Sequence, residues 1–220
     1  MLIDLAKATQ QHDFQLGDVI HCGAHFGQEV LEYREFGASR MVLIEPQPKC
    51  LRKLRSLFKK DPDIEIVPCA AGSHEADGTT ASMYVERHNK GQSSSLLKPL
   101  KHLAQYPKIK FNRRIEVEIR SLDSIMESFA DRSRFNFLNL DVQGFELEVL
   151  KGATATIEHL DAIVMEVNRD EMYEGCAMVE DADAFLADFG LQRVETNWVG
   201  GSWGDGLYAR TAPVSRSLSG

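Results

Sequence analysis

Glycines and an acid stand at the ends of two early apolar runs, where their types and spacing suit a nucleoside. Gly23 and Gly27 frame the segment GAHFG, and Glu45 lies 22 residues beyond the first glycine. The glycines would let the backbone turn tightly and approach a ligand, and the helix expected next would offer free amides. A carboxylate at this spacing can accept hydrogen bonds from both hydroxyls of a ribose. Each feature alone also fits a plain turn or a solvated acid, but together they predict a nucleoside-containing cofactor.

Asp141 is the strongest single candidate for chemistry, because it ends the nearly apolar run FNFLNLD. A carboxylate at the end of a buried strand is costly unless it has a partner or a ligand. Glu146 opens the next helix, where an acid also suits the helix dipole and can be purely structural. Glu166 and Asn168 end the following apolar run; with Asp141 they could hold Mg²⁺ or Ca²⁺, but capping explains them equally well. We therefore predict no metal ligands and keep a divalent ion as the less favoured alternative.

The order of the elements indicates how these residues come together. Short apolar runs alternate with segments of helical period, as in β–α–β units around a parallel sheet. Residues 73–114 lack a strong period and are expected to form a long excursion. The alternating run at 115–120 is expected to be an edge or half-exposed strand. The other expected strands are 18–22, 41–46, 64–70, 135–141 and 161–167, and an antiparallel hairpin of LQRVETN and GLYAR.

We therefore predict the α/β fold class, with a single Rossmann-like, doubly wound and mostly parallel sheet that ends in a C-terminal antiparallel hairpin. One domain would span residues 1–210, and residues 211–220 would form a disordered tail. In such a sheet, ligands bind in a crevice at the carboxyl ends of the strands. The strand ends that carry glycines or acids would converge there.

The composition fits a soluble globular protein. The chain has 220 residues, 43% of them hydrophobic, and a formal net charge of −8. This acidic balance argues against a nucleic-acid partner, which needs a broad basic surface. The polar start MLIDLAKATQQHD lacks the apolar core of a signal peptide, and no apolar run is long enough to span a membrane. We expect a cytoplasmic protein with no membrane partner, whose four dispersed cysteines are reduced.

Several stretches of the chain match a known family in order, from about residue 18 to 210. They are GAHFGQ, LIEPQP, PCAAGS, SLDSI, LNLDVQGFELEVLKGA, IVMEV and GDGLYAR. In these stretches the chain resembles the FkbM family of S-adenosylmethionine-dependent methyltransferases, and LDVQGFELEVLKGA is the most specific of them. The resemblance implies a class I methyltransferase fold and S-adenosylmethionine as cofactor. It also implies methyl transfer to a hydroxyl oxygen of a small molecule, such as a sugar or a secondary metabolite.

The resemblance assigns the cofactor a set of lining positions: Gly23, His25, Gly27, Glu45, Cys69, Ala70 and Asp141. Within this set, the glycine segment would line the methionine and ribose, and the acid of the second strand would hold the ribose hydroxyls. The end of the third strand would lie near the adenine, and Asp141 would face the methionine or the acceptor. One departure is His21, which stands where these proteins usually carry an acid. It could be a neutral hydrogen-bonding substitute.

Methyl transfer to an alcohol needs a group that accepts the hydroxyl proton. The candidate catalytic residues are Asp141, His25 and Glu146. His25 has a suitable ordinary pKa, although a histidine in a cofactor loop is often only a hydrogen-bonding wall. Neither the base, the acceptor nor the oligomeric state follows from the sequence.

The acceptor would be a small hydroxylated molecule, and two features bear on its chemistry. Basic residues gather between 98 and 120, where they could attract an anionic acceptor such as a phosphorylated sugar, or form a solvated loop. Trp198 and Trp203 could stack on a sugar ring or anchor the closing turns.

Two other functions compete with this hypothesis. A nicotinamide-dependent oxidoreductase would require a GxGxxG loop, which GAHFG does not provide. A catalytically degenerate protein of the same fold would bind a cofactor or a partner without turnover, and the histidine at position 21 is its support.

Overall fold

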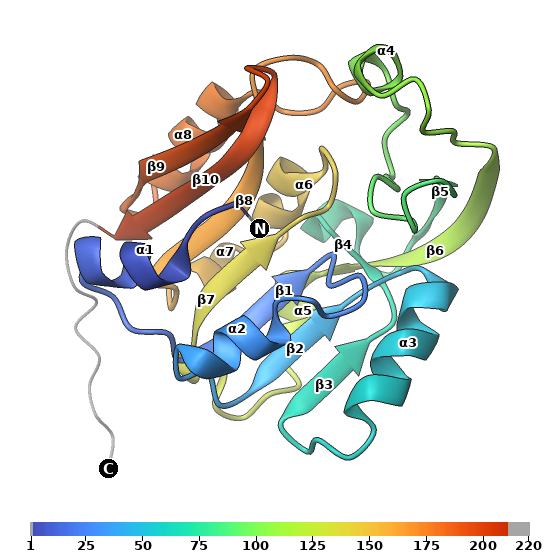
Figure 1. Ribbon diagram of the computed structural model, residues 1–220. Coiled ribbons are helices and arrows are strands. Elements are labelled where there is room, and N and C mark those ends of the chain that lie inside the picture. The colour runs from blue at the N-terminus through green and yellow to red at the C-terminus, as the bar shows by residue number, and fades with distance from the viewer. Residues whose placement is uncertain (1, 211–220) are drawn as a thin grey trace.

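A seven-stranded sheet forms the centre of the protein, seen in a computed structural model that describes residues 2–210 (Figure 1). The strands run in the order β3-β2-β1-β7-β8-β10-β9. Neighbours from β3 to β8 pair in parallel, and β10 is antiparallel to both β8 and β9. This arrangement confirms the predicted α/β fold with its C-terminal hairpin. The strand bounds are β1 Asp18–Cys22, β2 Met41–Ile44, β3 Ile64–Val67, β7 Phe135–Leu140, β8 Ala162–Asn168, β9 Leu191–Val199 and β10 Trp203–Arg210.

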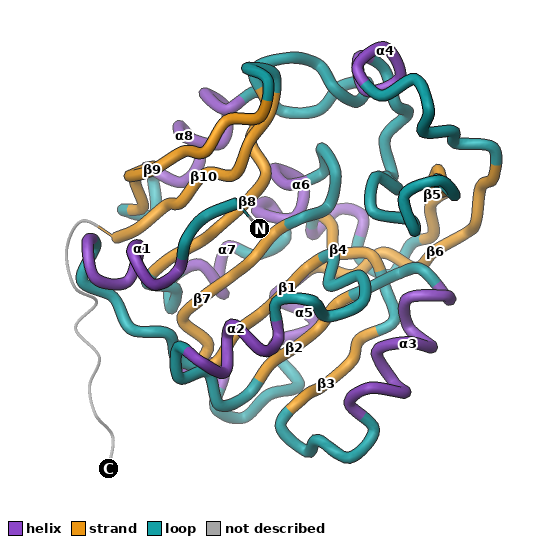
Figure 2. Tube along the Cα trace, viewed as in Figure 1, coloured by secondary structure: helices purple, strands orange, loops and turns teal. Residues whose placement is uncertain are grey.

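Helices cover both faces of this sheet (Figures 1 and 2). Successive side chains of a strand point to opposite faces. Val19 belongs to an apolar cluster that includes residues of α1, α2 and α3, whereas Ile20 belongs to a second cluster that includes residues of α5, α6, α7 and α8. Strands buried on both faces read as continuous apolar runs, which is why the sequence revealed them. None of the helices within residues 2–210 is long and apolar enough to cross a lipid bilayer. The helix bounds are α1 Leu5–Gln11, α2 Val30–Glu35, α3 Pro48–Phe58, α5 Leu122–Met126, α6 Glu146–Lys151, α7 Thr154–Ile157 and α8 Val179–Ala187.

A small second sheet, in the order β4-β6-β5, holds the segment expected to be an excursion. The run at 64–70 is not one strand: Pro68 has no amide hydrogen to continue the ladder, and the chain leaves the main sheet after Val67. The run at 115–120 is not an edge, because β6 lies between β4 and β5. The predicted tail, 211–220, lies outside the described residues. The elements of this region are β4 Ala70–Gly72, β5 Thr80–Val85, α4 Lys101–Gln105, β6 Arg113–Ser121, and the 3₁₀ turns His74–Ala76 and Arg132–Arg134.

Asp123 supplies the cap that α7 lacks in its own sequence. The residue before α7 is Ala153, which has no side-chain acceptor. The Asp123 carboxylate accepts instead from the backbone amides of Ala155 (2.9 Å) and Thr156 (2.8 Å), and from the Thr156 hydroxyl (2.6 Å). Burial alone would raise the pKa of Asp123, but these donors and His74 outweigh it and hold the pKa below its usual value. The SLDSI segment therefore joins two helices on the same face of the sheet.

Asp123→Ala should lower the free energy of unfolding by about 1–2 kcal/mol, because it leaves helix-end amides without an acceptor. A carboxyl whose folded pKa is depressed stabilises the protein above its unfolded pKa, so this loss should shrink as the pH falls below about 4. Urea unfolding at several pH values measures both effects. The exposed Glu127→Ala, in the same segment, is the control and should change stability by less than about 0.5 kcal/mol. Equal effects of the two substitutions would contradict the capping role.

Candidate active site

A cavity of about 370 Å³ opens at the carboxyl ends of the parallel strands. The ends of β1, β2, β7 and β8 all reach its wall, as the predicted crevice requires. The predicted site residues in its lining are Gly23, His25, Glu45, Cys69, Ala70 and Asp141. Gly27 and Glu146 are not part of that lining. Gly27 faces α3, where an added Cβ would lie 2.8 Å from the ring of Phe58.

Gly23 is required by a close approach of two strand ends. Its φ is +83°, and a Cβ at this position would lie 1.9 Å from the carbonyl oxygen of Asp141. A side chain there would collide with the backbone and would also be strained. The glycine therefore brings the β1 loop against the end of β7 and leaves its own backbone open to the cavity.

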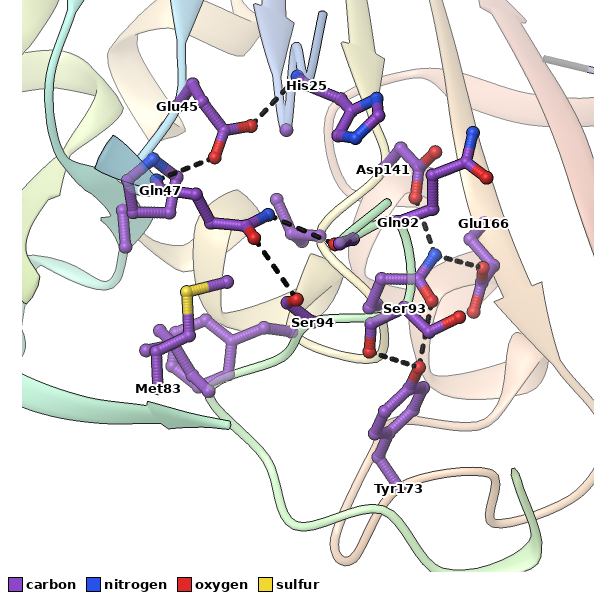
Figure 3. A pocket seen from close by; sticks show the side chains of 18 of the residues that line it. His25, Glu45, Gln47, Met83, Gln92, Ser93, Ser94, Asp141, Glu166 and Tyr173 are labelled. Atoms are coloured by element: carbon purple, nitrogen blue, oxygen red, sulfur yellow. Dashed lines mark hydrogen bonds between the residues drawn. The ribbon is translucent and has the colours of Figure 1, made fainter. Parts of the chain in front are cut away.

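Glu45 is buried at the end of β2 and holds the backbone of two flanking segments (Figure 3). Its two carboxylate oxygens accept from the amides of His25 (2.8 Å) and Gln47 (2.7 Å). Burial raises the pKa of Glu45 to about 7, although these two amides oppose the rise. Each oxygen keeps a lone pair for a further donor. The carboxylate can therefore accept hydrogen bonds from a ligand at the cavity wall.

Asp141 directly follows β7 in the cavity lining, and its side chain is exposed there. The Gln143 amide nitrogen bridges its Oδ1 (2.7 Å) and the Oε2 of Glu166 (3.0 Å), and the Gln143 amide oxygen accepts from the Tyr173 hydroxyl (2.8 Å). Figure 3 shows Asp141, Glu166 and Tyr173 grouped at one end of the cavity. Desolvation by the surrounding protein raises the pKa of Asp141; the Gln143 hydrogen bond opposes the rise, and the charge of Asp205 adds to it. Burial and the neighbouring acids likewise hold the pKa of Glu166 well above its usual value.

The His25 ring is held through both of its nitrogens. Nε2 lies 3.1 Å from the carbonyl oxygen of Lys90, so it must carry the hydrogen. Nδ1 is then the acceptor for the side-chain amide of Gln28 at 3.0 Å. A ring held in this way has no free nitrogen to receive a proton from an acceptor. The contacts therefore favour the hydrogen-bonding wall over the catalytic base.

Glu146 stabilises the turn that follows β7 through hydrogen bonds. Its Oε1 accepts from the amides of Val142 (3.1 Å) and Gly144 (3.2 Å), while its side chain borders a smaller neighbouring pocket. Burial raises the pKa of Glu146 to about 8. The turn between these amides carries Gln143 in the left-handed conformation, with φ of 58°. Glu146 thus supports the residue that bridges Asp141 and Glu166.

Part of the cavity wall, which we call the far wall, is formed by His102, Tyr106 and Trp203. The sequence did not indicate that these residues lie together. Trp203 donates from its indole nitrogen to the hydroxyl of Tyr106 (2.9 Å), and both side chains line the cavity with His102. His102 is buried, its Nδ1 has no hydrogen-bond partner, and burial lowers its pKa. Trp198 does not line the cavity; the Arg169 guanidinium stacks on it at 3.6 Å from the ring centre. The sequence suggested Trp203 as a residue that could stack on a sugar ring, but no local pattern indicated a role for His102 or Tyr106.

The cavity wall is acidic. Among the described residues that line it, five are acids and none is a lysine or an arginine: Glu29, Glu45, Asp141, Glu166 and Asp205. The basic residues between 98 and 120 lie elsewhere. Lys98 pairs with Glu174 and Lys101 with Asp170, while the Arg114 guanidinium stacks on Tyr84. An anionic acceptor, one of the two interpretations of that basic stretch, therefore has no basic side chain in this lining to attract it.

The suggested metal ligands do not form a cation site with the arrangement seen here. Gln143 places an amide donor between Asp141 and Glu166, where a bridging cation would have to lie. Asn168 borders the smaller neighbouring pocket rather than this cavity. Within residues 2–210 no cluster of three or more His, Cys, Asp or Glu side chains has the arrangement of a metal site.

His21 is buried and lines the cavity in place of the usual acid. The hydroxyl of Tyr33 lies 3.2 Å from its Nδ1 and accepts from the Asn139 amide at 2.7 Å. Burial lowers the pKa of His21, although the charges of Glu29 and Asp141 oppose this. The residue is therefore a neutral member of a buried hydrogen-bonded group.

Solved structures of methyltransferases share this fold. A crystal structure of the methyltransferase FkbM from Methylobacillus flagellatus KT aligns with a TM-score of 0.55 and 16% identity, covering 89% of this chain and 44% of that one. Fibrillarin from Aeropyrum pernix, solved with natively bound S-adenosyl-L-methionine, aligns with a TM-score of 0.50 and 11% identity, covering 93% of this chain and 74% of that one. These likenesses show the class I methyltransferase fold.

Sequence comparison identifies the family. The 2-O-methyltransferase NoeI of Sinorhizobium fredii (strain NBRC 101917 / NGR234) is 35% identical over 83 residues, which make up 38% of this chain and 34% of that protein. The aligned part thus spans about a third of that relative. A family model described as the methyltransferase FkbM domain matches residues 21–192, which contain nearly all of the cavity wall. The chain belongs to the FkbM family of methyltransferases.

Proposed function

We propose that this protein transfers the methyl group of S-adenosylmethionine to a hydroxyl oxygen of a sugar or a similar polyol. The observation that carries the proposal is one cavity that joins Glu45 and Asp141 to a wall of aromatic and acidic side chains. The partial likeness to a 2-O-methyltransferase supports a hydroxyl as the acceptor.

The residues at the ends of β1, β2 and β3 fit S-adenosylmethionine. Gly23 leaves backbone open for the methionine part, and Glu45 has lone pairs for the ribose hydroxyls. Cys69 and Ala70 offer the apolar surface that a purine needs. When bound, the cofactor supplies a methyl group on a positively charged sulfur. The acidic wall favours that charge.

Asp141 is the proposed base. Of the three catalytic candidates it has a carboxylate open to the cavity, whereas the His25 ring is held at both nitrogens and Glu146 binds backbone amides. Its raised pKa brings it closer to working pH, where a carboxylate accepts a proton more effectively. The bridge from Gln143 would hold it in place as the acceptor hydroxyl gives up its proton.

The far wall suits an uncharged acceptor with several hydroxyls. Trp203 and Tyr106 offer aromatic faces for the apolar side of a sugar ring. Glu166 and Asp205 face each other in the β8–β10 pairing and could accept hydrogen bonds from hydroxyls. In an acidic lining a phosphate would be repelled, so we propose a neutral sugar rather than the anionic acceptor that was one of two interpretations of the basic residues between 98 and 120.

Glu45→Gln should weaken the binding of S-adenosylhomocysteine by roughly tenfold or more, because a charged acceptor is lost and an amide donor faces backbone amides. The wild-type affinity should also fall as the pH drops below about 7, since Glu45 must be ionised to accept both ribose hydroxyls. The variant should lose that part of the pH dependence. Calorimetric titration between about pH 8 and 6 tests both statements. Glu65→Gln, an exposed acid on β3, is the control, and equal affinities would contradict the assignment.

Incubation with S-adenosylmethionine and a panel of neutral and phosphorylated sugars should yield O-methylated neutral sugars, detected by mass spectrometry. EDTA should leave the rate unchanged, because Gln143 occupies the place of a bridging ion. Asp141→Asn should reduce kcat about 100-fold or more at saturating cofactor. A preference for phosphorylated sugars, or loss of activity in EDTA, would overturn these parts of the proposal. Cofactor binding without turnover on any hydroxylated acceptor would favour the catalytically degenerate alternative.

Trp203→Leu should raise the KM for a neutral sugar about tenfold and leave the affinity for S-adenosylhomocysteine unchanged. Trp198→Leu removes a tryptophan from the same hairpin outside the cavity, and it should leave the KM near the wild-type value. Initial-rate kinetics on the best acceptor of the panel distinguish the two. A KM that responds equally to both substitutions would argue against a sugar platform at Trp203.

A further inference from the structure

A buried carboxylate outside the cavity organises the loop that closes part of its wall. Glu86 directly follows β5 and is 1% exposed. Its oxygens accept from the backbone amides of His88 (2.7 Å) and Asn89 (2.7 Å), and from that of Gly91. Successive amides that point at one carboxylate hold a turn in a compact shape. We call residues 86–95 the Glu86 loop.

The Glu86 loop is bound to the two residues whose backbone amides Glu45 holds. Three hydrogen bonds join the loop to His25 and Gln47, and Figure 3 shows the one between Gln47 and Ser94. They join His25 Nε2 to the carbonyl of Lys90 (3.1 Å), Gln47 Nε2 to the carbonyl of Gly91 (3.1 Å), and Ser94 Oγ to Gln47 Oε1 (3.3 Å). The loop therefore binds the side chains of His25 and Gln47, and Glu45 binds their backbone amides.

Gly91 lets the loop come this close. Its φ is +100°, and a Cβ there would lie 2.6 Å from Oε1 of Gln47. The preceding Lys90 also has a positive φ, 60°, which costs a residue with a side chain some free energy. Such a conformation persists when its surroundings hold it, and the carboxylate of Glu86 is the group at the centre of this turn.

The two sides of the loop differ in exposure. Residues 87–90 and Gln92 are exposed, whereas Gly91, Ser93 and Ser94 are buried. The three buried residues line the cavity together with Asn89 and Gln92. Ser95 continues the attachment on the acceptor side by donating to the backbone carbonyl of Gln143 at 2.7 Å. The loop thus spans the cavity from the cofactor side to the residue that bridges Asp141 and Glu166.

We propose that Glu86 is a positioning residue for S-adenosylmethionine: it fixes the Glu86 loop, which in turn holds His25 and Gln47 around Glu45. Glu86 is absent from the cavity lining described above, so it acts through the loop. This proposal rests on cofactor binding by the protein and is independent of the acceptor.

Glu86→Gln tests the proposal with little change in size. The amide keeps one acceptor oxygen but turns a donor towards backbone amides, so the loop should loosen. We expect S-adenosylhomocysteine to bind roughly tenfold more weakly or worse. Trypsin should cleave the variant faster after the exposed Arg87 and Lys90, and the ligand should slow this cleavage in the wild type. Glu116→Gln, an exposed acid on β6, should match the wild type in both assays.

Gly91→Ala provides a second test that leaves Glu86 in place and disturbs the contact with Gln47. It should also weaken the ligand and speed cleavage, and circular dichroism verifies that each variant is folded. Wild-type affinity in either folded variant would overturn the proposal, even if cleavage becomes faster. Failure to find a sugar acceptor would refute the proposed function and leave this result standing. If the wild type fails to bind S-adenosylhomocysteine, both the proposed function and the role of Glu86 are refuted, because both require cofactor binding.

Discussion

The carboxylates of Glu45, Asp141, Glu146 and Glu166 lie close together at the carboxyl edge of the sheet. Glu45, Glu146 and Glu166 are buried, and desolvation by the surrounding protein raises the pKa of all four. Acids placed this close together and away from water destabilise a fold unless donors surround them. Backbone amides supply those donors to Glu45 and Glu146, and an amide side chain supplies them to the other two. The loops at this edge take the shapes that bring these amides to the acids.

In these loops, three residues other than glycine adopt a left-handed backbone conformation. His25, Lys90 and Gln143 all have positive φ, and each takes part in a hydrogen bond at or beside the cavity. Strained conformations of this kind concentrate where surrounding contacts over-determine them, and those places are often functional. Here hydrogen bonds at Lys90 and Ser95, together with the backbone between them, connect His25 at one end of the cavity to Gln143 at the other.

The same acids give the cavity its chemical preference. A wall that carries several carboxylates and, among the described lining residues, no basic side chain favours positive charge and hydroxyl donors over anions. This suits both a positively charged sulfonium and a neutral polyol. Membership of the FkbM family accounts for the methyl transfer. Under the proposed function, the wall would determine which acceptors share the cavity with the cofactor.

The parallel sheet, its C-terminal hairpin and the convergence of Gly23, Glu45, Asp141 and Glu166 could be predicted from the amino-acid pattern, because strand ends in a parallel sheet meet at one edge. Which of these groups face the cavity and which bind other parts of the chain depends on the folded packing. The contacts of His25 with Lys90 and of Gln143 with Glu166 join residues far apart in the chain. The pairing of Tyr106 with Trp203 and the turn around Glu86 likewise depend on loop conformations that no local period encodes. Hydrophobic periodicity specifies which face of an element is buried, whereas polar contacts between loops arise only once packing has fixed the distances between them.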